Sequence, residues 1–286
     1  MTAQLTEVDS QTDTAPVMPA RTRAMIEAPV VATLLRLAAP NLLFIASQAV
    51  VSIGETYFIG WLGADALAAV SLVFPVLMIM QTTSGGGIGS GVASAISRAL
   101  GAGRRADADA LVLVSLVIAA TFGVAFTAAV VLGGRMLFTA MGGVGPALDQ
   151  ADIYGTILFS GALLFWIFNT LGSILRGAGI MSLPAMTSSV GAVMTLTVSP
   201  AMILGLGPVP RLGIGGAALA VLAYYTVGTI ILGAFLLSGR APVRLAFPAR
   251  IEWRLFRNVL RVGLPGAVTA IVFNSAILFF TALVGP

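Results

Sequence analysis

The stretch LLRLAAPNLLFIASQAVVSIGETYFIG, from Leu34 to Gly60, decides the fold because it combines a membrane-length apolar run with a carboxylate, Glu55. Counted at about 100° per residue, Asn41, Gln48 and Ser52 fall with this carboxylate in a sector of about 60° on a helix. An ionisable side chain at the centre of a membrane helix costs about 2.5 to 3.5 kcal/mol, so it usually faces a bundle interior or a water-filled cavity. We therefore expect this helix to line a polar cavity.

The composition indicates an integral membrane protein. Of the 286 residues, 58% are hydrophobic and 9% are charged, and the mean hydropathy is +1.02. A water-soluble globular protein is not expected to tolerate such a composition. Cysteine and histidine are both absent, which excludes disulfides, thiol chemistry, histidine-based catalysis and zinc sites built on those ligands. We expect no metal site and no cofactor.

The basic residues favour a membrane orientation over a nucleic-acid partner. All 15 are arginines that stand singly or in pairs at the ends of apolar runs, although the sequence pI is about 10.3. Thirteen lie on one side of the predicted membrane, and only Arg135 and Arg211 lie on the other. By the positive-inside rule, the arginine-rich side, which includes the N-terminus, is cytoplasmic. We expect a multi-pass protein of the cell (inner) membrane.

Seven apolar runs follow a polar segment, residues 1–33, which we interpret as a disordered cytoplasmic arm. Each run is long enough to cross about 30 Å of hydrocarbon as a helix. The alternating pattern of barrel strands is missing, so we expect an all-α fold. The predicted spans are Leu34–Gly60, Ala66–Ser97, Ala110–Gly134, Ile153–Leu175, Leu183–Leu206, Leu212–Gly239 and Val262–Pro286.

An internal repeat divides these spans. The segment LRLAAP (Leu35–Pro40) recurs as LRVGLP (Leu260–Pro265), each time opening an apolar helix after a basic stretch. Six helices would then form one unit, and a second unit would begin parallel to it. Only 27 residues run from Leu260 to the end of the sequence. The expected domains are therefore a six-helix lobe (34–239), a basic cytoplasmic linker (240–261) and the first helix of an incomplete second lobe (262–286).

The glycine-rich piece SGGGIGSGVASAISRALGAGRRADADAL, Ser84 to Leu111, predicts close helix packing. No Lys-Ser or Lys-Thr pair follows its glycines, which counts against a phosphate-binding loop. Gly85 with Gly89, and Gly87 with Gly91, are small residues four apart, a spacing that lets helix backbones approach in lipid. Helices can also bend where prolines interrupt apolar runs, at Pro40, Pro75 and Pro200.

Six segments stand in an informative order and spacing. They are GETYFIGWLG (Gly54–Gly63), ALAAVSLVFP (Ala66–Pro75), the glycine-rich piece, ALGAGRRADADA (Ala99–Ala110), LRGAGIMSLP (Leu175–Pro184) and LGIGGAALA (Leu212–Ala220). Together they resemble the multidrug and toxic compound extrusion (MATE) transporters over about Leu34 to Pro286. The resemblance implies two six-helix lobes that export cationic amphipathic compounds in exchange for protons or sodium, with the missing second lobe supplied in cis.

The resemblance also implies site residues. Glu55 matches the acidic residue that the family uses for cation coupling in its first helix, where Asp is more usual. In the fifth helix, the family often has Asn and Asp four apart before a proline, whereas this chain has Thr195 and Ser199 before Pro200. Ile180 likewise replaces a frequent Asp. Hydroxyl groups can bind but do not titrate here, so coupling in this lobe would rest on one carboxylate, which favours a proton over sodium.

Other interpretations of these residues stay open. Glu55 lies six residues, about 9 Å along the helix axis, before Trp61 and could be a polar residue at a helix end that reaches headgroup water. Asn169 could line the same cavity or form an ordinary interhelical hydrogen bond. A few aromatic and methionine side chains could form a wall for flat cations, although most are expected in lipid or core: Tyr57, Phe58, Met78, Phe165, Trp166 and Met194.

The leading functional hypothesis is a secondary-active multidrug exporter in which loading of Glu55 and binding of the drug oppose each other. A flippase for lipid-linked oligosaccharides would need basic residues inside the cavity, and no apolar run has one in its interior. An intramembrane enzyme would need an acid pair or a nucleophile with its base, and neither is present. A half-length chain that folds without moving a substrate is a further alternative.

Overall fold

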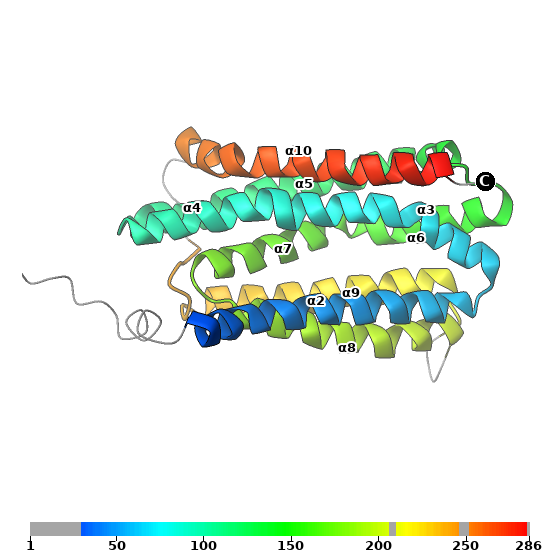
Figure 1. Cartoon of the computed structure of the whole chain (residues 1–286), viewed down its shortest axis with the longest axis horizontal. Helices are drawn as coiled ribbons and strands as arrows, with labels where there is room; N and C mark the ends of the chain where they lie inside the picture. Colours follow the sequence, from blue (N-terminus) through cyan, green and yellow to red (C-terminus); the bar gives the residue numbers. More distant parts are fainter. Residues whose placement is uncertain (1–29, 206–209, 246–251, 285–286) are drawn as a thin grey trace, which may run out of the picture. The chain divides into compact units, whose positions relative to one another are not determined.

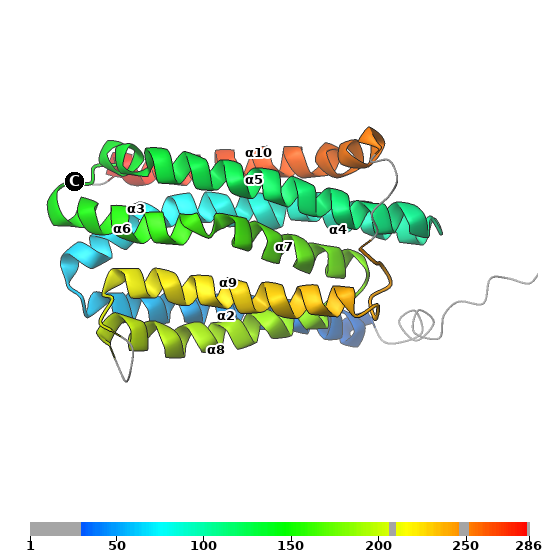
Figure 2. The same cartoon turned by 180° about the vertical axis from the view of Figure 1, so that it is seen from behind.

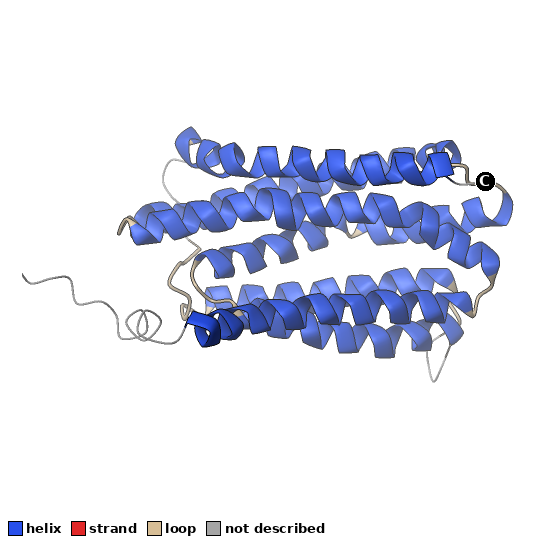
Figure 3. Cartoon of the chain, in the orientation of Figure 1, coloured by secondary structure: helices blue, strands red, loops and turns tan. Residues whose placement is uncertain are grey.

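The computed structural model describes residues 30–205, 210–245 and 252–284, and among these residues helices are joined by turns and loops, with no strand (Figure 3). Contacts divide the chain into two units, Met1–Asn41 and Leu42–Pro286. Helix α2 (Val30–Gly60) begins in the first unit and continues into the second. The prediction of a disordered arm over residues 1–33 is therefore wrong for residues 30–33, which are helical. Residues 1–29 lie outside the part of the chain that the structure describes.

The second unit contains the remaining helices. Among the described residues, five helices are long and apolar enough to cross a membrane, or six if the bent pair α6–α7 is one span. The chain is thus a multi-pass, all-α membrane protein, while the count of seven spans stays a prediction. The helices are α3 (Ala64–Gln81), η1 (Thr82–Ile88), α4 (Gly89–Gly101), α5 (Arg105–Ala140), α6 (Gly145–Ser160), α7 (Ala162–Gly177), α8 (Ser182–Leu204), α9 (Ile214–Leu237) and α10 (Trp253–Val284).

Within the second unit, α6 and α7 lie between two groups of helices (Figures 1 and 2). On one side they contact α3, α4 and α5, and on the other they contact α9, which packs along α8. Large side chains at this centre are fully buried, among them Trp166, Phe159 and Leu158. The core therefore follows the α6–α7 pair.

The predicted fourth span, Ile153–Leu175, is not one straight helix. Helices α6 and α7 meet at Gly161 with an angle of 47°. Two contacts favour this bend: the Thr127 hydroxyl donates a 2.9 Å hydrogen bond to the carbonyl of Phe159, and Leu222 of α9 occupies the space where a Cβ of residue 161 would lie. Kinks arise where small residues and inserted side chains interrupt a helix.

The glycine-rich piece packs as predicted, on two faces. A Cβ at Gly87 would lie 2.7 Å from the backbone of Ala267 in α10, and one at Gly91 would lie 2.5 Å from the Val259 carbonyl oxygen. The other pair, Gly85 and Gly89, faces α7, where a Cβ would lie 3.5 Å from Asn169 Oδ1 and 2.6 Å from Ser173 Oγ. Each pair thus serves a different neighbouring helix.

Helix α10 starts before the predicted seventh span, and the three prolines at which bending is predicted lie within helices. Helix α10 begins at Trp253, so residues 253–261 of the predicted linker are helical, which agrees with the good helix propensity of arginine and leucine. Pro75 lies inside α3 and Pro200 inside α8, and bending at these prolines stays a prediction. Pro40 lies in the part of α2 that belongs to the first unit.

Candidate functional site

A cavity of about 170 Å³ lies inside the second unit, between α2, α3, α6, α8 and α9. Its wall combines polar side chains with aliphatic and aromatic ones. The lining residues are Gln48, Val51, Ser52, Glu55, Thr56, Ile59, Val70, Val73, Phe74, Leu77, Met78, Gln81, Tyr154, Leu158, Thr195, Val221, Tyr224 and Tyr225. The polar face predicted for the first apolar run therefore borders a cavity.

Glycines let the helices around this cavity approach closely. Gly54 of α2 lies against Leu196 of α8, and Gly191 of α8 lies against the ring of Tyr224 in α9. A Cβ at either glycine would meet these side chains directly. Backbones can approach at such small residues in lipid, and the approach brings α2, α8 and α9 around one space.

Glu55 lies in the wall of this cavity with Gln48 and Ser52, its predicted companions on the same helix face. Its Oε1 atom is buried and has no hydrogen-bond partner among the described residues. Tyr154 of α6 and Tyr225 of α9 line the same cavity. The carboxyl group therefore borders an internal space, rather than being only a polar residue at a helix end.

The structure separates the other predicted polar residues. Thr195 lines the cavity, whereas Ser199, one turn further along α8, is fully buried outside it and its Oγ has no partner among the described residues. Asn169 is also outside the cavity lining: its Nδ2 donates to the Phe165 carbonyl at 3.2 Å, and its Oδ1 faces Gly85. The backbone of Asn41 is helical, but its side chain lies outside the described ones.

Sequence reasoning missed three tyrosines and a glutamine that complete the cavity. Tyr154, Tyr224 and Tyr225 join Gln81 in its wall. The rings of Tyr224 and Tyr225 lie 4.9 Å apart, and Phe165 meets Tyr225 edge-on at 4.9 Å. The available signal was the presence of phenol hydroxyls inside apolar runs, since buried tyrosines usually need a polar neighbour.

The cavity wall contains few charged side chains among the described residues. Glu55 is its only carboxylate, and no arginine lines it among the described residues. In the same part of the chain, no group of three acidic, histidine or cysteine residues gathers that could hold a metal ion. One carboxylate among aromatic rings and hydroxyls can accept a proton or attract a single positive charge, and ring faces can contribute to cation binding.

The fold and this cavity define a multi-pass helical membrane protein with a partly polar cavity between its helices. The family profile described as MatE matches residues 40–201, more than half of the sequence. The chain therefore belongs to the MatE family of transporters, and the predicted MATE resemblance is confirmed.

The chain is also similar to individual proteins. A FAD transporter of Shewanella oneidensis is 33% identical over 220 residues, covering 74% of this chain and 47% of the relative. The probable multidrug resistance protein NorM of Thermotoga maritima is 27% identical over 250 residues, covering 86% and 53%. The chain thus spans about half the length of these relatives.

Solved structures agree with the fold. An outward-facing multidrug resistance MATE transporter superposes with a TM-score of 0.79 at 28% identity, over 87% of this chain and 54% of that one. A transporter of the MOP superfamily from Pyrococcus furiosus superposes with a TM-score of 0.81 at 27% identity, over 91% and 57%. The latter is described as having a binding pocket of reverse polarity that suggests a different function.

Proposed function

We propose that this chain forms the first lobe of a secondary-active exporter that moves cationic amphipathic compounds outward in exchange for protons. The observation that carries the proposal is the position of Glu55, the one carboxylate that the described residues place in the wall of an internal cavity, which is otherwise neutral and partly aromatic. The N-terminus would face the cytoplasm of a cell with this protein in its inner membrane, as the distribution of arginines favours. The second lobe would be supplied in cis.

The proposed coupling follows from the cost of a buried charge. An ionised Glu55 would have to be stabilised within the cavity, because Oε1 has no hydrogen-bond partner among the described residues. A cationic substrate or a proton can each remove that cost, but they do so at the same oxygen atoms. Binding of one therefore opposes binding of the other, which is the exchange that an antiporter needs.

A proton suits this wall better than sodium. Sodium is held by several oxygen ligands, and here the ionic ligand would be Glu55 alone, assisted by neutral groups such as Thr195 and Gln48. A proton needs only one carboxylate oxygen. Protonation also makes the side chain neutral, so it changes the relative free energies of two packings of the lobe by removing a buried charge.

A second candidate comes from the relative that transports FAD. FAD carries phosphate charges, and a cavity for it would be expected to present arginine or lysine. The wall of this cavity has neither among the described residues. Anionic substrates, including lipid-linked oligosaccharides, are therefore disfavoured in this lobe.

Transport by the full reading frame that contains this chain tests the proposal. Inverted membrane vesicles with an acidic interior should accumulate a fluorescent lipophilic cation, and an uncoupler that collapses the proton gradient should abolish the accumulation. FAD should not be accumulated under the same conditions. Gradient-dependent accumulation of FAD but not of the cation would overturn the assignment of substrate class.

A further inference from the structure

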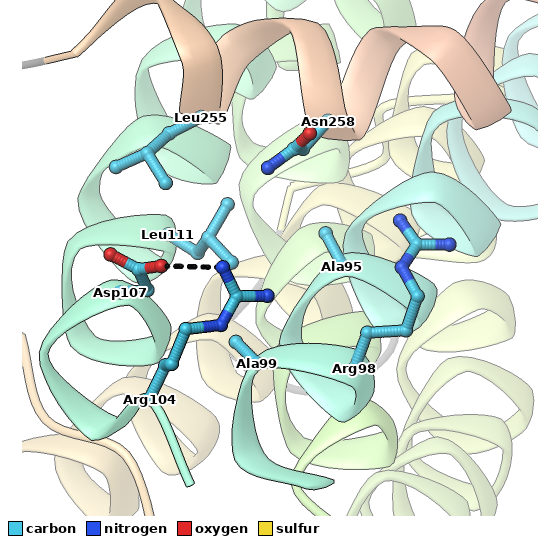
Figure 4. Close-up of a pocket in the computed structure, with 8 residues that line it drawn as sticks. All are labelled: Ala95, Arg98, Ala99, Arg104, Asp107, Leu111, Leu255 and Asn258. Carbon is cyan, nitrogen blue, oxygen red and sulfur yellow. Dashed lines mark ion pairs between the residues drawn. The ribbon is translucent and has the colours of Figure 1, made fainter. Parts of the chain in front are cut away.

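A second cavity, of about 120 Å³, lies where α4 ends and where α5 and α10 begin (Figure 4). Arg98 of α4 and Arg104, just before α5, stand at its sides, and Asn258 of α10 faces them. Asp107 pairs with Arg104 at its edge. Its remaining wall is apolar and consists of Ala95, Ala99, Leu111 and Leu255.

The cavity has more cationic than anionic groups. Arg98 Nη1 donates to Ser94 Oγ at 2.8 Å, and no carboxylate pairs with Arg98 in the described part of the chain. Asp107 is shared: Oδ2 lies 3.2 Å from Arg104 Nη1, and Oδ1 lies 3.2 Å from Arg254 Nη2. Arg254, which lies outside the cavity lining, also pairs with Glu252 at 3.1 Å. Asp107 and Glu252 together thus face Arg104 and Arg254, while Arg98 in the cavity wall has no carboxylate partner among the described residues.

These donors suit a phosphate group. A guanidinium presents five N–H donors in a planar fork that matches phosphate oxygens. Arg98, Arg104 and the amide of Asn258 approach from three different elements, and the amino end of α5 adds its favourable dipole for an anion. Basic pockets between membrane helices are typical sites for anionic lipid headgroups.

The depth of the cavity favours a lipid over a free anion. The long apolar run of α5 begins at Ala110, near Leu111 in the cavity wall. Trp253, which is 72% exposed and stacks on Phe256 with centroids 5.8 Å apart, opens α10 five residues before Asn258. Tryptophan is enriched at the level of lipid headgroups, so the arginines lie where polar and apolar regions of a membrane meet.

We propose that the cavity lined by Arg98, Arg104 and Asn258 binds the phosphate of an anionic phospholipid headgroup on the arginine-rich side of the membrane. Such a lipid would join the ends of α4, α5 and α10. This site is separate from the cavity of Glu55 and does not depend on which substrate the protein moves.

Native mass spectrometry of the full-length protein with phosphatidylglycerol tests the site. Arg98→Gln should weaken binding of this lipid about fivefold, because the variant loses a charge-assisted hydrogen bond to the phosphate that only an arginine in the cavity wall can make. Arg105→Gln is the matched control, because Arg105 is exposed, has the same charge and does not line the cavity; it should bind like the unaltered protein. Asp107→Asn should bind the lipid more tightly, because a competing negative charge is removed.

Two more measurements separate headgroup recognition from misfolding and from binding of a free anion. Phosphatidylcholine should bind equally to all variants, which would show that the variants are folded and that the protein distinguishes the anionic headgroup. Inorganic phosphate at the same concentration should not displace phosphatidylglycerol. Equal losses for Arg98→Gln and Arg105→Gln, or displacement of the lipid by inorganic phosphate, would overturn the proposal.

Discussion

The proposed chemistry rests on Glu55. The residues around its carboxyl group support that chemistry more strongly than the occurrence of an acid in the sequence does. A carboxyl group can be tolerated in a membrane helix when it faces a cavity, and here the cavity is lined by Gln48, Thr195 and three tyrosines. The unpartnered Oε1 atom leaves an acceptor without a ligand from the described protein. In the proposed function, this acceptor is where an incoming proton or cation would bind.

Two hydroxyls one turn apart on α8 provide a residue-scale prediction. Thr195 lines the cavity, so Thr195→Val, which keeps the shape but removes a hydrogen-bonding group, should lower the apparent affinity for the exported cation about fivefold. Ser199 is buried outside the cavity, and its Oγ has no partner among the described residues. Ser199→Ala should leave export unchanged and raise the free energy of unfolding by about 1 kcal/mol, because an unsatisfied polar atom is removed.

Concentration-dependent export and thermal unfolding in detergent measure both effects. Loss of affinity in the Ser199→Ala protein, with none in the Thr195→Val protein, would contradict the placement of these residues.

At the scale of elements, the contact of η1 with α10 depends on a missing side chain. A Cβ at Gly87 would lie 2.7 Å from backbone atoms of Ala267, which cannot move aside as a side chain would. Gly87→Ala should therefore destabilise the protein by about 1 to 3 kcal/mol. Gly86→Ala is the matched control, since nothing among the described residues lies within 4 Å of its Cβ position. Equal unfolding temperatures for the two variants would refute the close contact.

The sequence alone predicts some features of these helices but not others. The apolar runs, the glycine packing and the shared face of Gln48, Ser52 and Glu55 follow from length and helical periodicity, and the sequence alone predicts them. The bend at Gly161 does not, because it depends on Leu222 and Thr127, which are distant in the sequence.

The cavity wall shows a similar limit. Ser199 and Asn169 have suitable side chains, yet helix rotation directs Ser199 into packed surroundings, and Asn169 binds its own helix backbone. Tyr154 and Tyr225 were missed because each belongs to an apolar run whose rotation is set by neighbouring helices. Helical periodicity predicts which residues share one face of a helix. Which faces then meet to form a cavity depends on how the helices pack against one another.

At the scale of the whole molecule, the arginine distribution makes a topological prediction. The turn between α4 and α5, with three arginines around it, is expected on the cytoplasmic side, and the turn between α5 and α6 on the opposite side. The sequence contains no cysteine, so a single introduced thiol can be labelled without background. Ala102 and Val144 are both exposed, one in each turn.

A membrane-impermeant maleimide added to intact cells should label the Val144→Cys protein and leave the Ala102→Cys protein unlabelled until the membrane is permeabilised. The opposite pattern would reverse the orientation. In that case the proposed lipid site would lie in the outer leaflet.

Proton-driven export by the Glu55→Gln protein is the most direct measurement of the central claim. Glutamine keeps the shape and hydrogen-bonding capacity of the side chain but cannot titrate, so the variant should reach the membrane in normal amounts and lose gradient-dependent export of the fluorescent cation. Asp65→Asn, which neutralises an exposed carboxylate at the start of α3 outside the cavity, should export like the unaltered protein. Undiminished gradient-dependent export by the Glu55→Gln protein would contradict the account.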